Sequence, residues 1–379
     1  MTEQTNLKTT PLTALNTELG GKMVDFAGYE MPVQFPAGVM KEHLHTRDKA
    51  GLFDVSHMGQ VIVRPKSGKV EDAALAMERL VPVDVLGLKP GRQRYALFTD
   101  DKGGILDDLM IANRGDHLFV VVNAACKAQD LAHMQAQLSD TCEVTPLTDR
   151  ALIALQGPAA EGALAALAPE VAEMAFMDVR EVAILGTPCI VSRSGYSGED
   201  GYEVSVPAAK AEEFTRALLA NPDVQPIGLG ARDSLRLEAG LCLYGNDIDT
   251  GTTPVAAALE WAVQKVRRTG GARAGGFPGA DVILPEFAAG AGRRRVGIAP
   301  EGRAPIRDGA DLYADETSDA AIGRITSGSF GPTLGAPVAM GYVDSGLSAI
   351  GTRLFADLRG KRLPVTVATL PFITPRYKR

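Results

Sequence analysis

The alternation of apolar and polar positions divides the chain into two parts. Up to about residue 266, short apolar runs alternate with stretches of helical periodicity, which predicts strands and helices in turn. Beyond about residue 292, only short alternating runs remain, spaced by Gly and Pro, as is typical of a small β-barrel or sandwich. The pattern therefore predicts an α/β or α+β body followed by a β domain.

The strongest runs give the expected elements. In the body we expect strands at 60–63, 118–122, 151–155, 188–192 and 202–206, and helices at 70–80, 124–138, 159–167, 208–219, 231–238 and 254–266. In the β domain we expect strands at 295–299, 321–326, 338–343 and 362–368. Residues 1–50 are expected to be irregular, and the Gly-rich segment 267–280 is expected to be a linker.

Composition narrows the class of protein. With 379 residues, 45% of them hydrophobic and 22% charged, the chain is typical of a soluble globular protein with a full core. No apolar run approaches the ~20 residues that a bilayer span needs. The first residues have neither a basic stretch with an apolar core nor an Arg-rich amphipathic helix, so we see no targeting peptide and expect a cytoplasmic protein.

Charge and cysteine usage argue against two further classes. The net charge is −7 and the basic runs, such as Arg293–Arg295, are short, so nucleic acid is not an expected partner. The four cysteines are far apart and form no C-x-x-C pair, which favours free buried thiols over a zinc site or disulfides. His43 and His45 lack the i, i+4 spacing of a helical metal pair, and we expect no metal.

Two catalytic motifs begin but are incomplete. The run from Gly228 to Asp233 lacks the third glycine of a dinucleotide fingerprint and opens no βαβ unit, so a helix start is the better interpretation. Ser56 and His57 are neighbours on an extended segment and point to opposite faces, and no G-x-S-x-G elbow is present.

Acidic residues after a double glycine are the first candidate for chemistry. In the run Gly103–Leu109, Asp107 and Asp108 stand between a Gly turn and apolar residues. Two interpretations remain open: both acids face solvent, or one turns inward, where burial and hydrogen bonds fit it to act as acid, base or cation stabiliser. Asn123 follows the strand 118–122 and stands where a helix N-cap belongs.

A Gly-rich loop and a helix start supply further candidates. Between residues 194 and 203, glycines allow close backbone approach to a flat ligand, Tyr196 offers a ring, and Glu203 can accept two N–H donors. Arg236 is explained by an ion pair with Asp233, whereas Arg232 at the helix start suits a carboxylate or a ring carbonyl.

The motifs together resemble a known family. They are Val24–Tyr29, Leu52–Met58, Gly103–Leu109, Tyr196–Glu203, Ala231–Asp249, Ile325–Leu334 and Met340–Val343. In this order, and with the long run through Asp249 the most specific, they resemble the glycine cleavage T-protein (aminomethyltransferase) family from about residue 10 to the C-terminus. Gly331 and the loose 269–276 segment depart from the usual pattern and leave the domain linker open.

The resemblance implies both a fold and an activity. The fold is α+β: a ring of a ferredoxin-like domain and a second α/β domain within residues 1–275, closed by a C-terminal β-barrel at 285–379, around a central folate funnel. The family transfers the methylene of an aminomethyl group on the dihydrolipoyl arm of H-protein to tetrahydrofolate, giving 5,10-methylenetetrahydrofolate and ammonia. Tetrahydrofolate is thus implied as co-substrate, and lipoylated H-protein as partner, with no membrane involved.

The resemblance also assigns roles to residues. Asp107, the first of the pair, matches the essential aspartate that orients the folate amines and stabilises the iminium cation formed as ammonia leaves. Glu203 matches the carboxylate on the pterin edge, and Arg232 the guanidinium near the folate. The remaining matches are the pocket aromatics Tyr95 and Tyr196, the C-terminal contact Tyr377, Asn123 beside Asp107, and Trp261 near the funnel. A helix cap explains Asn123 equally well, and a core position would explain Trp261.

Two other classes share the resemblance. A demethylating oxidoreductase of this fold carries a flavin domain, for which the length of this chain leaves no room, so it would need a separate subunit. A non-catalytic folate-binding relative in iron–sulfur assembly carries a Lys-Gly-Cys-Tyr-x-Gly-Gln-Glu signature, whereas this chain has Gly240-Leu-Cys-Leu-Tyr-Gly-Asn-Asp247 and keeps Asp107.

Overall fold

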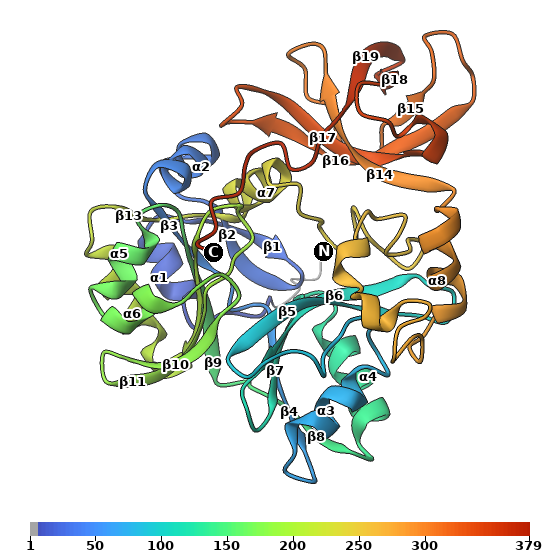
Figure 1. Cartoon of the computed structure of the whole chain (residues 1–379). Helices are drawn as coiled ribbons and strands as arrows, with labels where there is room; N and C mark the ends of the chain where they lie inside the picture. Colours follow the sequence, from blue (N-terminus) through green and yellow to red (C-terminus); the bar gives the residue numbers. More distant parts are fainter. Residues whose placement is uncertain (1–6) are drawn as a thin grey trace, which may run out of the picture.

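Two mixed α/β units and a closed barrel are seen in a computed structural model, which describes residues 7–379 (Figure 1). The barrel, drawn in orange and red, lies above the two α/β units, and the chain end runs back from it toward the unit on the left of the view. The predicted α+β architecture with a C-terminal barrel is confirmed.

A five-stranded sheet carries the acidic pair. Its strand order is β5-β6-β7-β4-β8. The strands are β4 (Gly59–Pro65), β5 (Arg92–Thr99), β6 (Ile105–Asn113), β7 (Leu118–Val122) and β8 (Cys142–Pro146). Helices α3 (Val70–Met77) and α4 (Lys127–Leu138) contribute Met77 and Met134 to the core on one face of this sheet, where they join Phe98, Leu109 and Ile111.

A six-stranded sheet forms the other unit, in the order β10-β11-β12-β9-β3-β13. Its strands are β3 (Ala50–Asp54), β9 (Arg150–Gln156), β10 (Val179–Ile184), β11 (Thr187–Ser192), β12 (Gly201–Pro207) and β13 (Val224–Pro226). The helical segments are α5 (Ala160–Ala165), η1 (Pro169–Glu173), η2 (Ala208–Lys210), α6 (Ala211–Leu219) and α7 (Leu229–Glu238). Phe214 and Leu218 of α6 pack into the core of this sheet. Strand β13 runs parallel to β3 through Val224 and Ala50, and the other pairings are antiparallel.

The N-terminal segment is ordered, contrary to the prediction for residues 1–50. It forms α1 (Thr13–Glu18), the hairpin strands β1 (Lys22–Phe26) and β2 (Tyr29–Gln34), and α2 (Val39–Asp48). Ala27 and Gly28 make the hairpin turn with positive φ angles of 52° and 78°. The hairpin escaped the pattern analysis because β1 buries none of its residues completely, so its side chains do not alternate between apolar and polar. The part of the prediction that covers residues 1–6 lies outside the described residues.

The segment from 254 to 289 also differs from the prediction. In place of a helix over 254–266, the chain makes two short 3₁₀ turns, η3 (Glu260–Ala262) and η4 (Lys265–Arg267), because Ala258 adopts a positive φ of 57° that no helix permits. The segment expected to be a linker packs against the rest of the molecule at its start. Arg267 is 4% exposed, and its guanidinium donates a hydrogen bond to Glu78 Oε2 at 3.1 Å. Helix α8 (Ala280–Ala289) follows, which the pattern did not predict.

The barrel contains the four strands that the sequence pattern predicted and two that it missed, at 311–313 and 353–358. Its strands are β14 (Arg293–Pro300), β15 (Asp311–Tyr313), β16 (Ala321–Gly331), β17 (Ala336–Asp344), β18 (Arg353–Leu358) and β19 (Lys361–Ala368), with η5 (Ser345–Leu347) after β17. They close in the order β14-β17-β16-β15-β18-β19. Ile298, Ile325 and Leu354 lie among its core residues.

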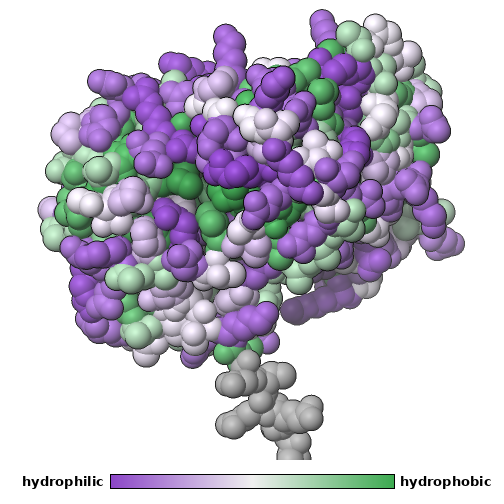
Figure 2. Space-filling model, turned by 90° about the horizontal axis from the view of Figure 1, so that it is seen from below, coloured by the Kyte–Doolittle hydropathy of each residue, from purple (hydrophilic) through white to green (hydrophobic). Residues whose placement is uncertain are grey.

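One face of the molecule is mainly polar. Figure 2 shows the face seen from below, where polar side chains predominate and apolar ones form smaller patches between them. Among residues 7–379, no helix has both the length and the apolar character to cross a bilayer.

Candidate active site

Strand β6 presents its two neighbouring aspartates to opposite sides of the sheet. Successive side chains alternate along a strand, and residues directly opposite each other on paired strands share a face. Asp107 is opposite Phe98 of β5, whereas Asp108 is opposite Leu97. Phe98 belongs to the core beneath α3 and α4, and Leu97 to a separate cluster that contains Cys242. The two carboxyl groups therefore lie in different environments.

The Asp107 carboxylate is completely buried on the helix side, with 0% of the residue exposed. It accepts a hydrogen bond from the backbone N–H of Asn123 at 3.2 Å and one from Asn123 Nδ2 at 2.9 Å. The Cys126 thiol and the Asp130 carboxyl also lie within hydrogen-bonding reach. Asn123, Cys126 and Asp130 lie outside both the loop 194–203, which carries Tyr196 and Glu203, and helix α7, which carries Arg232.

Asn123 bridges the two aspartates and does not cap a helix. Its Nδ2 donates to Asp107 Oδ1 at 2.9 Å and to Asp108 Oδ1 at 2.7 Å. Helix α4 begins only at Lys127, and no side chain caps its N-terminus. The helix-cap interpretation is therefore wrong, because the N-cap position of α4 is Cys126, three residues after Asn123. The structure brings Asn123 and Asp107 together, as the resemblance implies.

Asp108 is partly exposed and faces two of the predicted aromatic residues. The Tyr95 phenol lies close enough to its carboxylate to lower its pKa, and Tyr196 lies near enough for the charge of Asp108 to add to the effect of burial, which raises the pKa of the Tyr196 phenol. Burial, and then the neighbouring charge of Asp107, raise the pKa of Asp108 to about 7, against the lowering effect of the bonds from Tyr95 and Asn123. Near neutral pH this carboxyl can both hold and accept a proton.

Arg232, Tyr196 and Glu203 form a second cluster. The Arg232 guanidinium, at the start of α7, lies over the Tyr196 ring at 4.8 Å from its centroid. Burial lowers the pKa of Arg232, an effect that the charge of Glu203 opposes. Glu203 accepts a hydrogen bond from Ser194 Oγ to Oε2 at 3.0 Å. Within residues 7–379, no carboxylate forms an ion pair with Arg232, so its planar fork is available to a ligand.

Tyr95 and Trp261 are in contact with each other, whereas Tyr377 lies in the C-terminal tail against Phe176. The Tyr95 and Trp261 rings are 5.3 Å apart at an interplanar angle of 30°, and Trp261 is 61% exposed, so it is not a core aromatic. Tyr377 stacks on Phe176 at 4.1 Å. Arg376 beside it donates its backbone N–H to Gly198 at 2.9 Å, which ties the C-terminal tail to the loop that carries Tyr196.

His57 is a polar group that the sequence argument set aside. It is 4% exposed, lies edge-on to Phe26 at 5.5 Å, and its Nδ1 has no hydrogen-bond partner among the described residues. Burial and the charges of Arg232 and Lys127 lower the pKa of His57 to about 3, so the ring is neutral. The signal for this position was its place in Leu52–Met58, one of the motifs that carry the family resemblance, rather than any base-and-nucleophile spacing.

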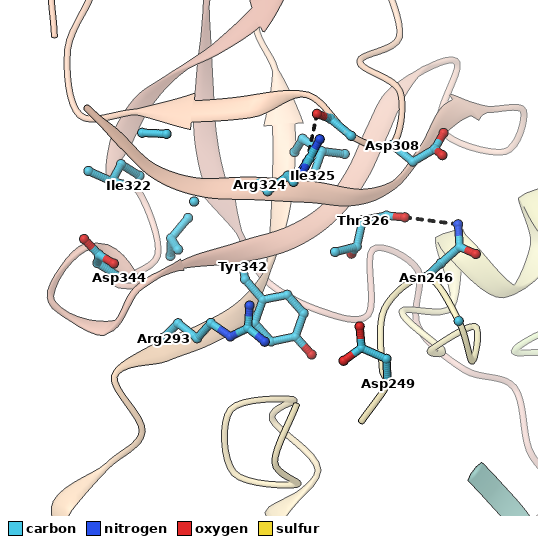
Figure 3. Close-up of a pocket in the computed structure, with 15 residues that line it drawn as sticks. Asn246, Asp249, Arg293, Asp308, Ile322, Arg324, Ile325, Thr326, Tyr342 and Asp344 are labelled. Atoms are coloured by element: carbon cyan, nitrogen blue, oxygen red, sulfur yellow. Dashed lines mark hydrogen bonds between the residues drawn. The ribbon is translucent and has the colours of Figure 1, made fainter. Parts of the chain in front are cut away.

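A separate pocket of about 650 Å³ lies between the barrel and the loop after α7 (Figure 3). Asn246 and Asp249 from the loop face Thr326, Tyr342 and Arg293 of the barrel. Asn246 Nδ2 donates to the Thr326 carbonyl at 3.3 Å. None of the predicted site residues lines this pocket.

Comparison with known proteins decides the family. A family model described as the GCVT N-terminal domain matches residues 12–267, and one described as the glycine cleavage T-protein C-terminal barrel domain matches residues 293–373. The chain belongs to the glycine cleavage T-protein family. The crystal structure of the glycine cleavage system aminomethyltransferase T from Bartonella henselae is 42% identical, with a TM-score of 0.90 and coverage of 99% of this chain and all of that one.

The family's curated members carry the same activity in their names. The aminomethyltransferase of Dictyostelium discoideum is 44% identical over 98% of this chain and 94% of its own length. The human aminomethyltransferase is also 44% identical, over 98% of this chain and 91% of its own length. The chain is accordingly an enzyme, an aminomethyltransferase of the glycine cleavage system.

The expected cytoplasmic localisation is contradicted by the same relatives. The aminomethyltransferases of Dictyostelium discoideum, Gallus gallus and Homo sapiens are all named mitochondrial. The expectation rested on the lack of a recognisable targeting pattern in the first residues. That is a weaker indicator than the names of relatives that match the chain over nearly its whole length.

Proposed function

We propose that this T-protein family member transfers the methylene of an aminomethyl group, carried by the dihydrolipoyl arm of H-protein, to tetrahydrofolate. In this reaction the C–S bond and the bond from carbon to the departing nitrogen break, and two C–N bonds form to the folate. The two amine protons lost from the folate pass to the sulfur and to the departing ammonia, so that atoms balance. The family membership supports the reaction, and the residues around Asp108 support the site.

The observation that carries the proposal is the unpaired Arg232. A part-buried guanidinium that forms no ion pair within residues 7–379 and lies over an aromatic ring is typical of a site that takes a planar or anionic ligand. Glu203 supports the same ligand, because Ser194 occupies only its Oε2 among the described residues and Oε1 is left for an N–H donor. A pteridine offers a ring carbonyl, N–H donors and a flat face, which suit Arg232, Glu203 and Tyr196 respectively.

The resemblance assigned the catalytic carboxylate to Asp107, and we move this proposed role to Asp108. Asp108 shares its side of β6 with Tyr95 and has Tyr196 nearby, whereas Asp107 lies beneath α4. Tetrahydrofolate supplies the two amines that take the methylene. When ionised, Asp108 accepts hydrogen bonds from cationic or amine N–H groups and stabilises positive charge in a site shielded from water. Tyr95 and Asn123 hold the carboxylate in place.

The other predicted residues keep supporting roles in this proposal. Trp261 and Tyr95 form an aromatic wall next to Asp108, and Trp261 is open to an arriving substrate. Tyr377 stays a predicted folate contact, at the tail that is bound to the loop of Tyr196. We further propose that the chain divides into a folate-binding body over residues 1–275 and a barrel domain over 285–379.

A coupled assay tests the reaction. The purified enzyme is supplied with aminomethylated H-protein, and ammonia release is followed with and without tetrahydrofolate. We expect rapid release only in the presence of the folate, with one methylenetetrahydrofolate formed for each ammonia. Release at the same rate without folate, or demethylation of sarcosine with an added flavin subunit and no reaction with H-protein, would contradict the proposal.

A further inference from the structure

A buried carboxyl pair lies behind the proposed catalytic aspartate. Asp107 of β6 and Asp130 of α4 are 0% and 1% exposed and lie within hydrogen-bonding reach of each other. Among the described residues, no Lys, Arg or His forms an ion pair with either one, and Asp130 Oδ2 is a buried oxygen without a hydrogen-bond partner. Two carboxyl groups this close in a dry interior do not both ionise near neutral pH, so one of them carries a proton.

The surrounding donors decide which carboxyl group is ionised. Asp107 accepts hydrogen bonds from the Asn123 backbone N–H and side-chain amide, and the Cys126 thiol is also within reach. Asp130 has no comparable donors, and burial together with the Asp107 charge raises the pKa of Asp130 to about 9. Asp130 is therefore the member of the pair that carries a proton, and its O–H donates to Asp107.

Asn123 connects this pair to the proposed site. Its Nδ2 donates to Asp107 Oδ1 at 2.9 Å on one side, and to Asp108 Oδ1 at 2.7 Å and the Asp108 carbonyl at 3.1 Å on the other. An amide held at both hydrogens cannot rotate without losing a charge-assisted bond. Asp107 thus fixes the amide, and the amide fixes one oxygen of Asp108.

We infer that Asp130, in its acid form, is a positioning residue for aminomethyl transfer: it donates to Asp107, which holds the Asn123 amide against Asp108. The inference rests on the role proposed for Asp108 above. Without the Asp130 donor, the negative charge of Asp107 is no longer shared with an O–H group, and it acts more strongly on Asp108.

Other titratable groups face the pair but do not replace this donor. Burial, and then the nearby Cys126, Asp107 and Asp130, raise the pKa of the Tyr244 phenol, so this group is neutral near neutral pH. His133, also on α4, stacks edge-on to Phe98 at 5.4 Å, and burial lowers its pKa. Asp108 contributes its own charge from the far side of β6.

Two substitutions of Asp130 separate positioning from packing. Asp130→Asn keeps an N–H donor toward Asp107, and we expect it to retain kcat within about two-fold. Asp130→Ala removes the donor, and we expect kcat to fall about ten-fold while the KM for tetrahydrofolate stays within about two-fold, because a misplaced reacting group lowers the rate more than the binding. Glu143→Ala, which removes an exposed carboxylate from β8, is the matched control and should leave both constants unchanged.

A second readout does not depend on turnover. The carboxyl of Asp108 is titrated in the free enzyme by ¹³C NMR of labelled aspartate, and its signal is assigned from its loss in Asp108→Asn. In Asp130→Ala we expect this titration to move up by about one pH unit, because the Asp107 charge is unshared, and in Asp130→Asn to stay in place. A wild-type titration and kcat in Asp130→Ala, or equal losses in both variants, would overturn the inference.

The two readouts also distinguish this inference from the proposed function. If Asp108→Asn retained turnover, the role of Asp108 would fail, and the NMR titration would still report whether Asp130 acts on it. If Asp108→Asn abolished turnover and Asp130→Ala changed neither readout, only the positioning role would fail.

Discussion

Strand β6 places one aspartate on each side of the sheet, and the two side chains differ in burial and in hydrogen bonding. Asp107 is sealed beneath α4 and is satisfied by Asn123, whereas Asp108 is partly exposed and lies beside Tyr95. Asp107 has its hydrogen bonds complete within the protein. Burial and the Asp107 charge raise the pKa of Asp108 to about 7. Tyr196 lies nearby, and the Arg232 guanidinium over its ring forms no ion pair with a carboxylate within residues 7–379.

The comparison shows that neighbouring residues on one strand can have different roles: one carboxyl group holds the structure, and the next is placed to act on a ligand. A carboxylate whose acceptor capacity is filled by the protein is fixed and cannot respond to a substrate. One that keeps an oxygen free in a partly dehydrated position has its proton affinity adjusted by its neighbours and can act on a ligand. The predictions below test whether function lies on the Asp108 side.

The largest expected effect is that of Asp108→Asn. The substitution keeps shape but removes the charge, so we expect kcat to fall by about 10²–10³-fold with tetrahydrofolate binding nearly unchanged. Steady-state ammonia release and calorimetric titration measure the two quantities. Asp116→Asn, at an exposed position after β6, serves as control. A variant that keeps half of the wild-type rate would remove Asp108 from the mechanism.

Glu203→Ala should raise the Kd for folate and have a smaller effect on kcat, the turnover once folate is bound. Loss of a charge-assisted contact to the pterin edge is expected to cost about 2–4 kcal/mol of binding free energy. Isothermal titration calorimetry measures it, with Glu181→Ala, an exposed carboxylate on β10 of the same sheet, as control. An unchanged Kd would place the pterin elsewhere.

The rate should depend on pH through Asp108. Because burial and the Asp107 charge raise the pKa of this carboxyl to about 7, its ionised fraction grows about ten-fold per pH unit below that value. We expect kcat/KM to rise with pH up to about 7 and then level off. A profile that is flat from pH 5.5 to 8 would show that no such group controls the reaction.

The smallest expected effect concerns stability and the Asp107 side. The pKa of Asp130 is about 9 in the folded protein against 3.8 ordinarily, so between these values the folded state binds more protons than the unfolded one. The free energy of unfolding should then decrease as pH rises, by at most about 1.4 kcal/mol per unit. Asp130→Asn should flatten this slope, which urea unfolding at several pH values measures. An unchanged slope would mean that Asp130 is ionised throughout.

Much of the fold could be predicted from the sequence, because the spacing of apolar residues differs between strands and helices. Barrel strands such as β17 and buried strands such as β7 and β9 bury apolar side chains in short, regular runs, and each was predicted. The hairpin β1–β2 and the turns η3 and η4 were missed, because their course follows from backbone turns and long-range contacts rather than from apolar periodicity.

The site was accessible only in part. The motif run predicted Glu203, Arg232 and Tyr196, and the structure brings these three together. It could not say which aspartate points inward to the ligand, because both are flanked by apolar residues. The phase of the strand held a usable signal: Asp107 is in step with Leu109 and Ile111, which pack under the helices, and Asp108 is not. The Asp107–Asp130 contact joins β6 to a helix 23 positions away and has no local signature.

The most direct test of the account is a crystal structure of the enzyme with tetrahydrofolate bound, at a resolution that orients the carboxylates. The account predicts an Asp108 oxygen within hydrogen-bonding distance of a folate amine, with Glu203 on the pterin edge and Asp107 still bound to Asn123 beneath α4. A folate amine bonded to Asp107, or a ligand in the pocket between barrel and loop with Asp108 facing water, would contradict it.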